Sequence, residues 1–158
     1  MSRAFVKEDD AAPQPIPERP VSAAPNLVTP RGARLIKEAI GELQARLVRA
    51  SAEEAESIRR DLRYWLSRQA SMRVVAPVAA PEVVGVGTRV AMQRGSVETV
   101  VTIVGEDESD PPNGRIAWTA PLARALAGAA AGDIVEFETA GRREAIVVVA
   151  LSGSPDER

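Results

Sequence analysis

The stretch that decides the fold spans residues 114–137 and reads GRIAWTAPLARALAGAAAGDIVEF. Its strand-like opening, RIAW, is broken by Thr-Ala-Pro, continues as one alanine-rich turn, and resumes after Gly-Asp as the strand-like IVEF. Thr119 or Ala120 suits a helix cap, Pro121 the first turn and Gly128 the C-terminal stop. A tight turn would be enough to join two strands, so the pattern predicts a short, displayed helix within a sheet.

Three further strand-like segments surround this stretch, and Gly95 and Gly141 mark the turns of two hairpins. Five strands and one short helix predict an α+β domain, which we expect over residues 83–152. The predicted strands cover residues 88–93, 97–104, 115–118, 134–139 and 144–151.

Upstream of this domain the apolar period changes to that of helices. Thr29 is a good N-cap before Pro30, and Ser51 with Glu54 forms a capping box for a second helix. Because only a few residues separate the two helices, they must run antiparallel, as a hairpin or short coiled coil over residues 28–74. The apolar face is formed by Ile36, Ile40, Leu43 and Leu47 on the first helix and by Ala55, Ile58, Leu62 and Trp65 on the second.

The remaining segments have no apolar period. Residues 1–27 are rich in proline and are predicted to be a disordered tail, although SRAFVKEDD at its start would also suit a docking peptide. Residues 75–82 contain two prolines and are predicted to be a linker, and residues 153–158 a short C-terminal tail.

Composition excludes several classes of function. The chain has no cysteine and no histidine, which removes thiol catalysis, disulfides, the usual zinc sites and histidine acid–base chemistry. Aromatic residues make up only 3% of the chain, so a large aromatic ligand pocket is not expected. No apolar run resembles a signal peptide or a membrane span, and we therefore expect a soluble, cytoplasmic protein with no membrane partner.

Charge is unevenly distributed along the chain. Residues 29–75 hold ten Lys/Arg and six Asp/Glu, whereas residues 76–158 hold seven and twelve. A basic helical part and an acidic sheet part predict two units with different surfaces.

Three motifs resemble the bacterial Gre transcript-cleavage factors, GreA and GreB. TPRGARLIKEAI (residues 29–40) is similar to the opening of the family's first helix, and RRDLRYWLSRQASMRVV (residues 59–75) is closer to GreB than to GreA. The stretch IVGEDESDPPNGRIAWTAPLARALAG (residues 103–128), with its continuation to residue 151, resembles the family's C-terminal domain. The resemblance covers residues 28–151.

The resemblance implies a fold and a partner. The family's C-terminal domain has an FKBP-like fold and grips the rim of the secondary channel of bacterial RNA polymerase, and its coiled coil runs down that channel. It therefore implies transcription regulation as an elongation factor on a DNA-binding polymerase complex. The residues that match the docking surface are Trp118, Thr119, Ala120, Pro121, Leu122 and Arg124. In the structural alternative, Leu122, Ala125 and Leu126 simply plug one end of the sheet. Both can hold, since a helix has two faces: these three residues would point inward and the loop at residues 119–121 outward.

The hairpin tip departs from the family. The family's longer insertion carries an Asp-x-x-Glu pair that helps to hold a magnesium ion, and this insertion has no counterpart here. Glu53 and Glu56 do repeat an acidic pair at a spacing of three, but carboxylates in a first helical turn also stabilise the helix dipole. The shortened coiled coil resembles that of Rnk-type relatives, so we expect no catalytic residue, no metal site and no cofactor beyond indirect contact with the polymerase magnesium.

Basic residues follow both helices, and two interpretations stay open for them. They would contact nascent RNA or an acidic channel wall, or they would form a solvated helix face with paired charges. These residues are Arg46, Arg49, Arg59, Arg60 and Arg63.

The leading hypothesis is a non-catalytic, polymerase-binding regulator at the secondary channel, which is not itself an enzyme. The alternative is stimulation of cleavage of backtracked transcript through Glu53 and Glu56. A prolyl isomerase is less favoured, since the sheet domain offers only Trp118 and Phe137 as aromatic walls. We expect a monomer, with a dimer through Trp65 left open.

Overall fold

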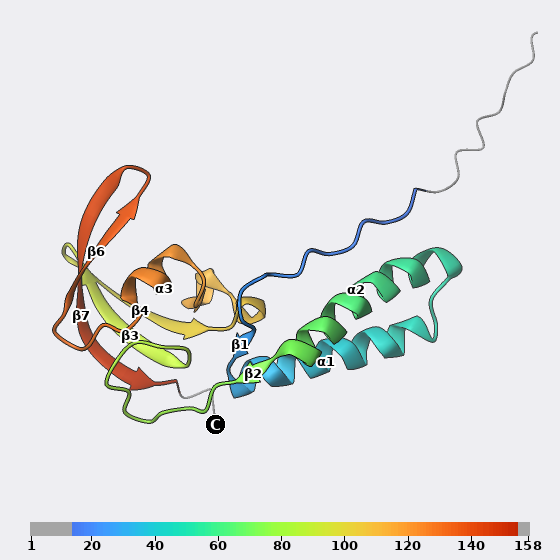
Figure 1. The fold of residues 1–158 in the computed structure, drawn as a ribbon, viewed down its shortest axis with the longest axis horizontal. Helices are drawn as coiled ribbons and strands as arrows, with labels where there is room; N and C mark the ends of the chain where they lie inside the picture. Colours follow the sequence, from blue (N-terminus) through green and yellow to red (C-terminus); the bar gives the residue numbers. More distant parts are fainter. Residues whose placement is uncertain (1–13, 155–158) are drawn as a thin grey trace, which may run out of the picture.

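The computed structural model describes residues 14–154, which form a helical hairpin and a sheet domain lying end to end (Figure 1). The hairpin consists of α1 (Pro30–Leu47) and α2 (Ala52–Ser71), and the chain reverses direction between them. The predicted order, an antiparallel hairpin followed by an α+β domain, is confirmed. None of the helices within residues 14–154 is long and apolar enough to cross a membrane.

Both helices begin at the predicted caps. The Thr29 hydroxyl accepts a hydrogen bond from the Gly32 amide, and Pro30 occupies the first helical position. Ser51 and Glu54 form the predicted capping box at the start of α2. The helices pack through an apolar seam, which ties the two halves of the hairpin together. Its buried side chains are Val28, Ala33, Ile36, Ile40, Leu43, Ile58 and Leu62.

The sheet domain is built on one five-stranded sheet in the order β5-β4-β3-β7-β6. All neighbours are antiparallel except β4 and β5, which pair in parallel. The pairing with β7 extends along the whole of β3 and contains a register shift between Ala91 and Met92. The strands are β3 (Thr88–Arg94), β4 (Val97–Val104), β5 (Arg115–Ala117), β6 (Ile134–Thr139) and β7 (Arg142–Gly153).

The short helix α3 (Pro121–Leu126) packs on one face of this sheet. Leu126 and Ala123 enter the core beside Met92, Ile146 and Val148. The expectation that Leu122, Ala125 and Leu126 face inward holds for Leu126, which is buried, and for Leu122, which packs against the core, whereas Ala125 is half-buried and Ala123 takes the second core position.

Residues 18–28 correct the prediction of a disordered tail up to residue 27. Leu27 and Val28 form a strand, β1 (Leu27–Val28), that pairs in parallel with β2 (Arg73–Val74). The Asn26 side chain is only 4% exposed, and its amide donates to the Arg68 carbonyl oxygen at 2.8 Å. Tertiary contacts with the hairpin therefore order a segment that has no apolar period of its own. The part of the prediction that falls on residues 1–13, including the SRAFVKEDD peptide, lies outside the described residues.

The predicted linker and C-terminal tail also contact the rest of the chain. The amide of Val75 donates to Val28 at 2.8 Å, and the amide of Gly153 donates to Ala79 at 3.2 Å. Strand β7 runs to Gly153, and Ser154 is buried, so the tail prediction is wrong for these two residues. Residues 155–158 lie outside the described part.

A buried carboxylate joins the hairpin to the sheet domain. Between β4 and β5 the chain forms two short 3-10 turns, η1 (Glu106–Glu108) and η2 (Pro111–Asn113). Glu108, 3% exposed, accepts hydrogen bonds from the amides of Thr29 at 3.1 Å and Gly105 at 3.0 Å, and from the Thr29 hydroxyl. This carboxylate lies so close to Gly32 that a Cβ there would be 2.2 Å from one of its oxygens.

We predict that Gly32→Ala destabilises the protein by about 1–3 kcal/mol, because the new methyl group displaces a buried, hydrogen-bonded carboxylate. Gly41→Ala is the matched control, since Gly41 lies in the same helix with nothing within 4 Å of its would-be Cβ. That change should stabilise the protein by about 0.5–1 kcal/mol through helix propensity. Urea unfolding of the two variants measures both effects, and an equal gain in both would contradict the packing at Gly32.

Candidate functional site

The predicted docking residues lie in the segment between β5 and α3 and in α3 itself. The Trp118 amide donates to Val104 at 2.9 Å and the Ala120 amide to Ala117 at 2.9 Å, so the backbone is held against the end of β4. Ala120 caps α3 without a side-chain hydrogen bond, and Pro121 begins the helix. The sequence therefore builds a rigid connection from strand to helix with little dependence on side-chain caps.

The structure separates the six predicted docking residues by exposure. Pro121 and Arg124 are exposed, whereas Trp118, Thr119, Ala120 and Leu122 are half-buried. Trp118, Ala120 and Leu122 pack against the sheet core. Pro121 and Arg124 are therefore the two of the six that are most accessible to a partner, and Trp118, Ala120 and Leu122 lie between them and the core of the sheet domain.

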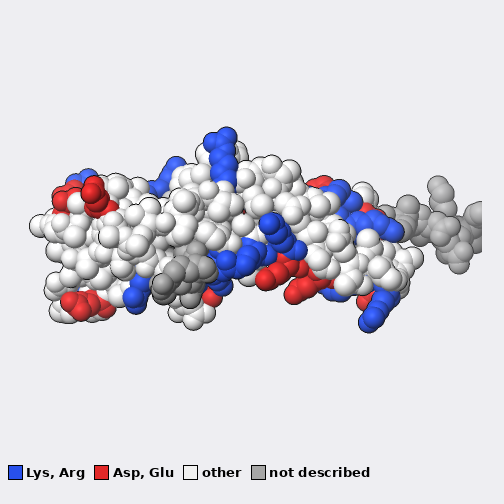
Figure 2. All heavy atoms as spheres, turned by 90° about the horizontal axis from the view of Figure 1, so that it is seen from below, with Lys and Arg blue, Asp and Glu red and all other residues white. Residues whose placement is uncertain are grey.

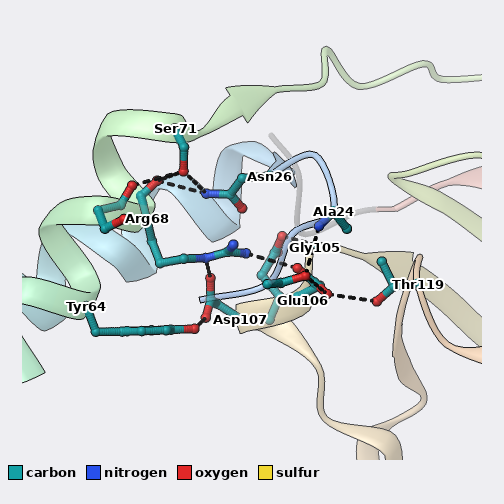
Figure 3. Close-up of polar contacts among 12 residues, drawn as sticks. Ala24, Asn26, Tyr64, Arg68, Ser71, Gly105, Glu106, Asp107 and Thr119 are labelled. Carbon is teal, nitrogen blue, oxygen red and sulfur yellow. Dashed lines mark hydrogen bonds and ion pairs between the residues drawn. The ribbon is translucent and has the colours of Figure 1, made fainter. Parts of the chain in front are cut away.

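Thr119 connects this segment to the hairpin through Glu106 (Figure 3). Its hydroxyl donates to the Glu106 carboxylate at 3.1 Å, and the same carboxylate lies 3.4 Å from the Arg68 guanidinium of α2. The Ser22 hydroxyl donates to this carboxylate at 2.9 Å. One side chain thus links the predicted docking segment, the second helix and the segment that precedes the hairpin.

Arg68 is the centre of this junction, and its side chain is buried although it carries a charge (Figure 3). Its Nε donates to Asp107 at 2.5 Å, and Asp107 in turn accepts a hydrogen bond from the Tyr64 hydroxyl. Burial, and after it this hydrogen bond to Asp107, raises the pKa of Tyr64 to about 12. Because an unpaired buried charge is costly, Arg68 holds α2 close to the acidic turn η1.

The basic residues predicted to face a channel fall into two groups. Arg46 and Arg49, at the end of α1, are exposed and have no carboxylate within 4 Å among residues 14–154. The three arginines of α2 are paired instead. Arg59 lies 3.9 Å from Glu56, Arg60 lies 2.8 Å from Asp61, and Arg63 pairs with Glu18 and with Glu56.

On the face shown in Figure 2, acidic and basic side chains lie among one another along the hairpin, and no continuous basic stripe is seen. The tip is different, because Arg46 and Arg49 line an open hollow there together with Glu54 and Ile58. Of the five basic residues predicted to face a channel, Arg46 and Arg49 at the tip are therefore the two without a carboxylate within 4 Å among residues 14–154.

The acidic pair at the tip is open to solvent, and one of its carboxylates is paired. Glu53 and Glu56 are both exposed, and Glu56 is shared between Arg59 at 3.9 Å and Arg63 at 3.8 Å. Glu54 is engaged by Ser51, and these hydrogen bonds lower the pKa of its carboxyl group. Within residues 14–154, no group of three or more Asp, Glu, His or Cys side chains is close enough together to hold a metal ion.

Sequence reasoning missed the residues that assemble the junction. Glu106, Asp107 and Glu108 lie within the stretch that resembles the family's C-terminal domain, but neither they nor Arg68 are predicted as site residues. The one sequence feature that points to the junction is the position of three carboxylates just after a buried strand. Carboxylates at such a position are expected to cap a helix or to pair with a cation. No local pattern identifies α2 as the partner, since Arg68 is 38 residues or more from each of its partners in the sequence.

The single tyrosine of the chain allows this junction to be tested. We predict that the tyrosinate absorbance titrates near pH 12 and that Asp107→Asn lowers this midpoint, because the hydrogen bond that favours the neutral hydroxyl is weakened. The sign is set by the raised pKa: the stability contributed by Tyr64 is complete below pH about 10, the value of an unfolded tyrosine, and is lost as the pH rises towards 12.

Asp110→Asn is the control for this titration, since Asp110 lies in the same acidic stretch but bonds to Asn113. It should leave the midpoint unchanged. A wild-type midpoint near pH 10, or equal midpoints in both variants, would show that Tyr64 does not bond to Asp107.

Comparison with known proteins agrees with this geometry. The family model described as "Transcription elongation factor, GreA/GreB, C-term" matches residues 79–152, the sheet domain with its leading segment. A GreA of Methylobacterium nodulans is 31% identical over 131 residues, which covers 79% of this chain and 83% of the relative. A GreB of Neisseria meningitidis is 37% identical over 97 residues, or 60% of each chain.

Two solved structures are also similar. The GreA/GreB factor of Nitrosomonas europaea aligns over 80% of this chain and 98% of its own, with a TM-score of 0.41 and 20% identity. The GreA factor homolog Gfh1 of Thermus thermophilus aligns over 78% and 91%, with a TM-score of 0.41 and 16% identity. From the family model and the Methylobacterium relative, the resemblance seen in the sequence motifs is confirmed, and this chain belongs to the GreA/GreB family of transcription elongation factors.

Proposed function

We propose that this protein binds bacterial RNA polymerase at its secondary channel and regulates transcription there without supplying a cleavage tip. The observation that carries the proposal is the hairpin itself. Its helices have 18 and 20 residues, so they reach only about 27–30 Å. The Glu56 carboxylate near the tip is shared between two arginines instead of lying open to a metal ion.

Docking would use the end of the sheet domain at which α3 begins. Pro121 and Arg124 are exposed there, and the half-buried Trp118 and Leu122 hold them in place. This surface lies in the part of the chain that the GreA/GreB family model matches, which supports a shared partner. This protein would act in the cytoplasm, on polymerase complexes that are bound to DNA.

The tip would bring positive charge into the channel. Arg46 and Arg49 are exposed at the end of α1, and Val48 between them is 86% exposed. A cationic tip suits the phosphates of nascent RNA or an acidic channel wall, and this attraction would weaken as the salt concentration rises. The hairpin would then regulate by occupying the channel, with a monomer as the acting form.

Two other functions compete less well. Stimulation of transcript cleavage would need Glu53 and Glu56 to hold a polymerase magnesium ion, and Glu56 would first have to leave Arg59 and Arg63. Prolyl isomerisation would need aromatic walls, but Trp118 and Phe137 both pack against the core of the sheet domain. Trp65, the residue considered for a dimer contact, has intramolecular partners in Tyr64 and the hairpin seam.

Transcript cleavage in a backtracked elongation complex tests the proposal, with a Gre factor alone, this protein alone, and the two mixed. We expect no cleavage by this protein and a dose-dependent loss of Gre cleavage in the mixture, because both proteins compete for one channel. Arg124→Glu should weaken competition about tenfold, or about 1.4 kcal/mol. Arg89→Glu, at an exposed position on the other face of the sheet, is the matched control.

The outcomes separate the candidates. Cleavage by this protein that is lost in Glu53→Gln/Glu56→Gln would make it a cleavage-stimulating factor. Neither cleavage nor competition at saturating protein would remove polymerase as the partner. Equal competition by Arg124→Glu and Arg89→Glu would keep polymerase but move the contact away from α3.

A further inference from the structure

The segment before the hairpin, residues 18–26, lies along α2, and we call it the arm (Figure 1). Near its start, the Arg19 guanidinium stacks over the Tyr64 ring at 3.8 Å and lies 5.6 Å from the centre of the Trp65 ring. Arg19 also lies 3.9 Å from Asp61. Beside it, the Glu18 carboxylate accepts a bifurcated hydrogen bond from the Nε of Arg63, 3.1 Å to each oxygen, and a further hydrogen bond from a terminal nitrogen of Arg63.

The two ends of the arm are held differently. At the lower end Asn26 is buried and bonded to α2, and the chain continues into the β1–β2 pair. At the upper end the paired side chains are open to water, with Glu18 61% and Arg63 49% exposed. Exposed ion pairs and cation–π contacts each change an equilibrium by only about two- to fivefold. The lower end is therefore an anchor, and the upper end is released easily.

The surface under the arm has the composition of a protein-binding surface. The arm covers Arg63 through Glu18 and Tyr64 through Arg19, and arginine and tyrosine are among the residue types enriched in interface hot spots. The surface is also continuous with the proposed docking segment, because Ser22 of the arm and Thr119 donate to the same oxygen of Glu106. The arm thus covers residues that would otherwise extend the docking surface along α2.

We propose that Arg63 and Tyr64 form a second polymerase-contacting surface and that the arm covers it until polymerase displaces residues 18–22. The inference rests on the proposed function. The partner segment must offer what the arm offers: a carboxylate for Arg63 and, one step along an extended chain, a cation over the Tyr64 ring. The apparent affinity for polymerase is then reduced by the fraction of molecules in which the arm is closed.

The test uses the full chain with Glu18→Gln/Arg19→Gln, which removes both upper contacts without changing the net charge. The control, Glu82→Gln/Arg89→Gln, makes the same exchanges at exposed positions of the linker and of β3. Backbone NMR order parameters for the amides of residues 18, 19 and 21–24 report arm closure. We expect them to fall from roughly 0.85 to below roughly 0.6 in the arm variant alone.

Affinity for core RNA polymerase is measured on the same proteins. The arm variant should bind about five- to tenfold more tightly than wild type and control, and adding Arg63→Ala should remove this gain. A mobile arm with unchanged or weaker binding would overturn the proposal, and so would an arm that stays ordered in the variant. If neither wild type nor variant binds polymerase, the proposed function is what fails, and this inference fails with it.

Discussion

The arrangement of this molecule depends on one buried charge. Arg68 is 1% exposed, and its guanidinium can be kept there only if carboxylates surround it. Asp107 and Glu106 supply them from the sheet domain, while Glu108, the next residue, receives the amide and hydroxyl of Thr29. Three consecutive acidic residues therefore bind both helices: one accepts hydrogen bonds from the N-cap residue of α1, and the other two pair with the arginine near the end of α2. The direction of the hairpin relative to the sheet follows from that turn.

The proposed binding to polymerase needs such a constraint. Docking through α3 would place the hairpin correctly only if the angle between the two parts is fixed, because an error at the base is magnified over about 30 Å of helix. The link between Thr119, Glu106 and Arg68 runs from the docking segment to α2 through a single carboxylate. The geometry of the proposed contact and the direction of the proposed channel-filling element are thereby coupled through hydrogen bonds and ion pairs, without a large apolar interface between the parts.

Local features of this fold could be predicted from the sequence. The caps at Thr29 and Ser51 and the limits of β4 and β6 follow from residue types within a few positions of each other. The ordered arm, the β1–β2 pair and the partners of Arg68 could not be predicted, since each joins residues about 40 or more positions apart. The candidate site divides in the same way: Pro121 and Arg124 are marked by the α3 motif, whereas the pairing of Arg63 with Glu18 arises only after the chain has folded back.

The parallel pairing of β1 with β2 has a consequence for how such proteins diversify. It brings the points where the chain enters and leaves the hairpin side by side, with Leu27 opposite Arg73 and Val28 opposite Val74. The helices between them behave as an insert on a closed base. Two helical turns added to each of the two helices would extend the hairpin by about 10 Å, while the β1–β2 pair, the acidic turn and the sheet kept their places. The length of the hairpin and the proposed docking surface are therefore independent in this architecture, and evolution can lengthen or shorten the hairpin without changing the sheet domain.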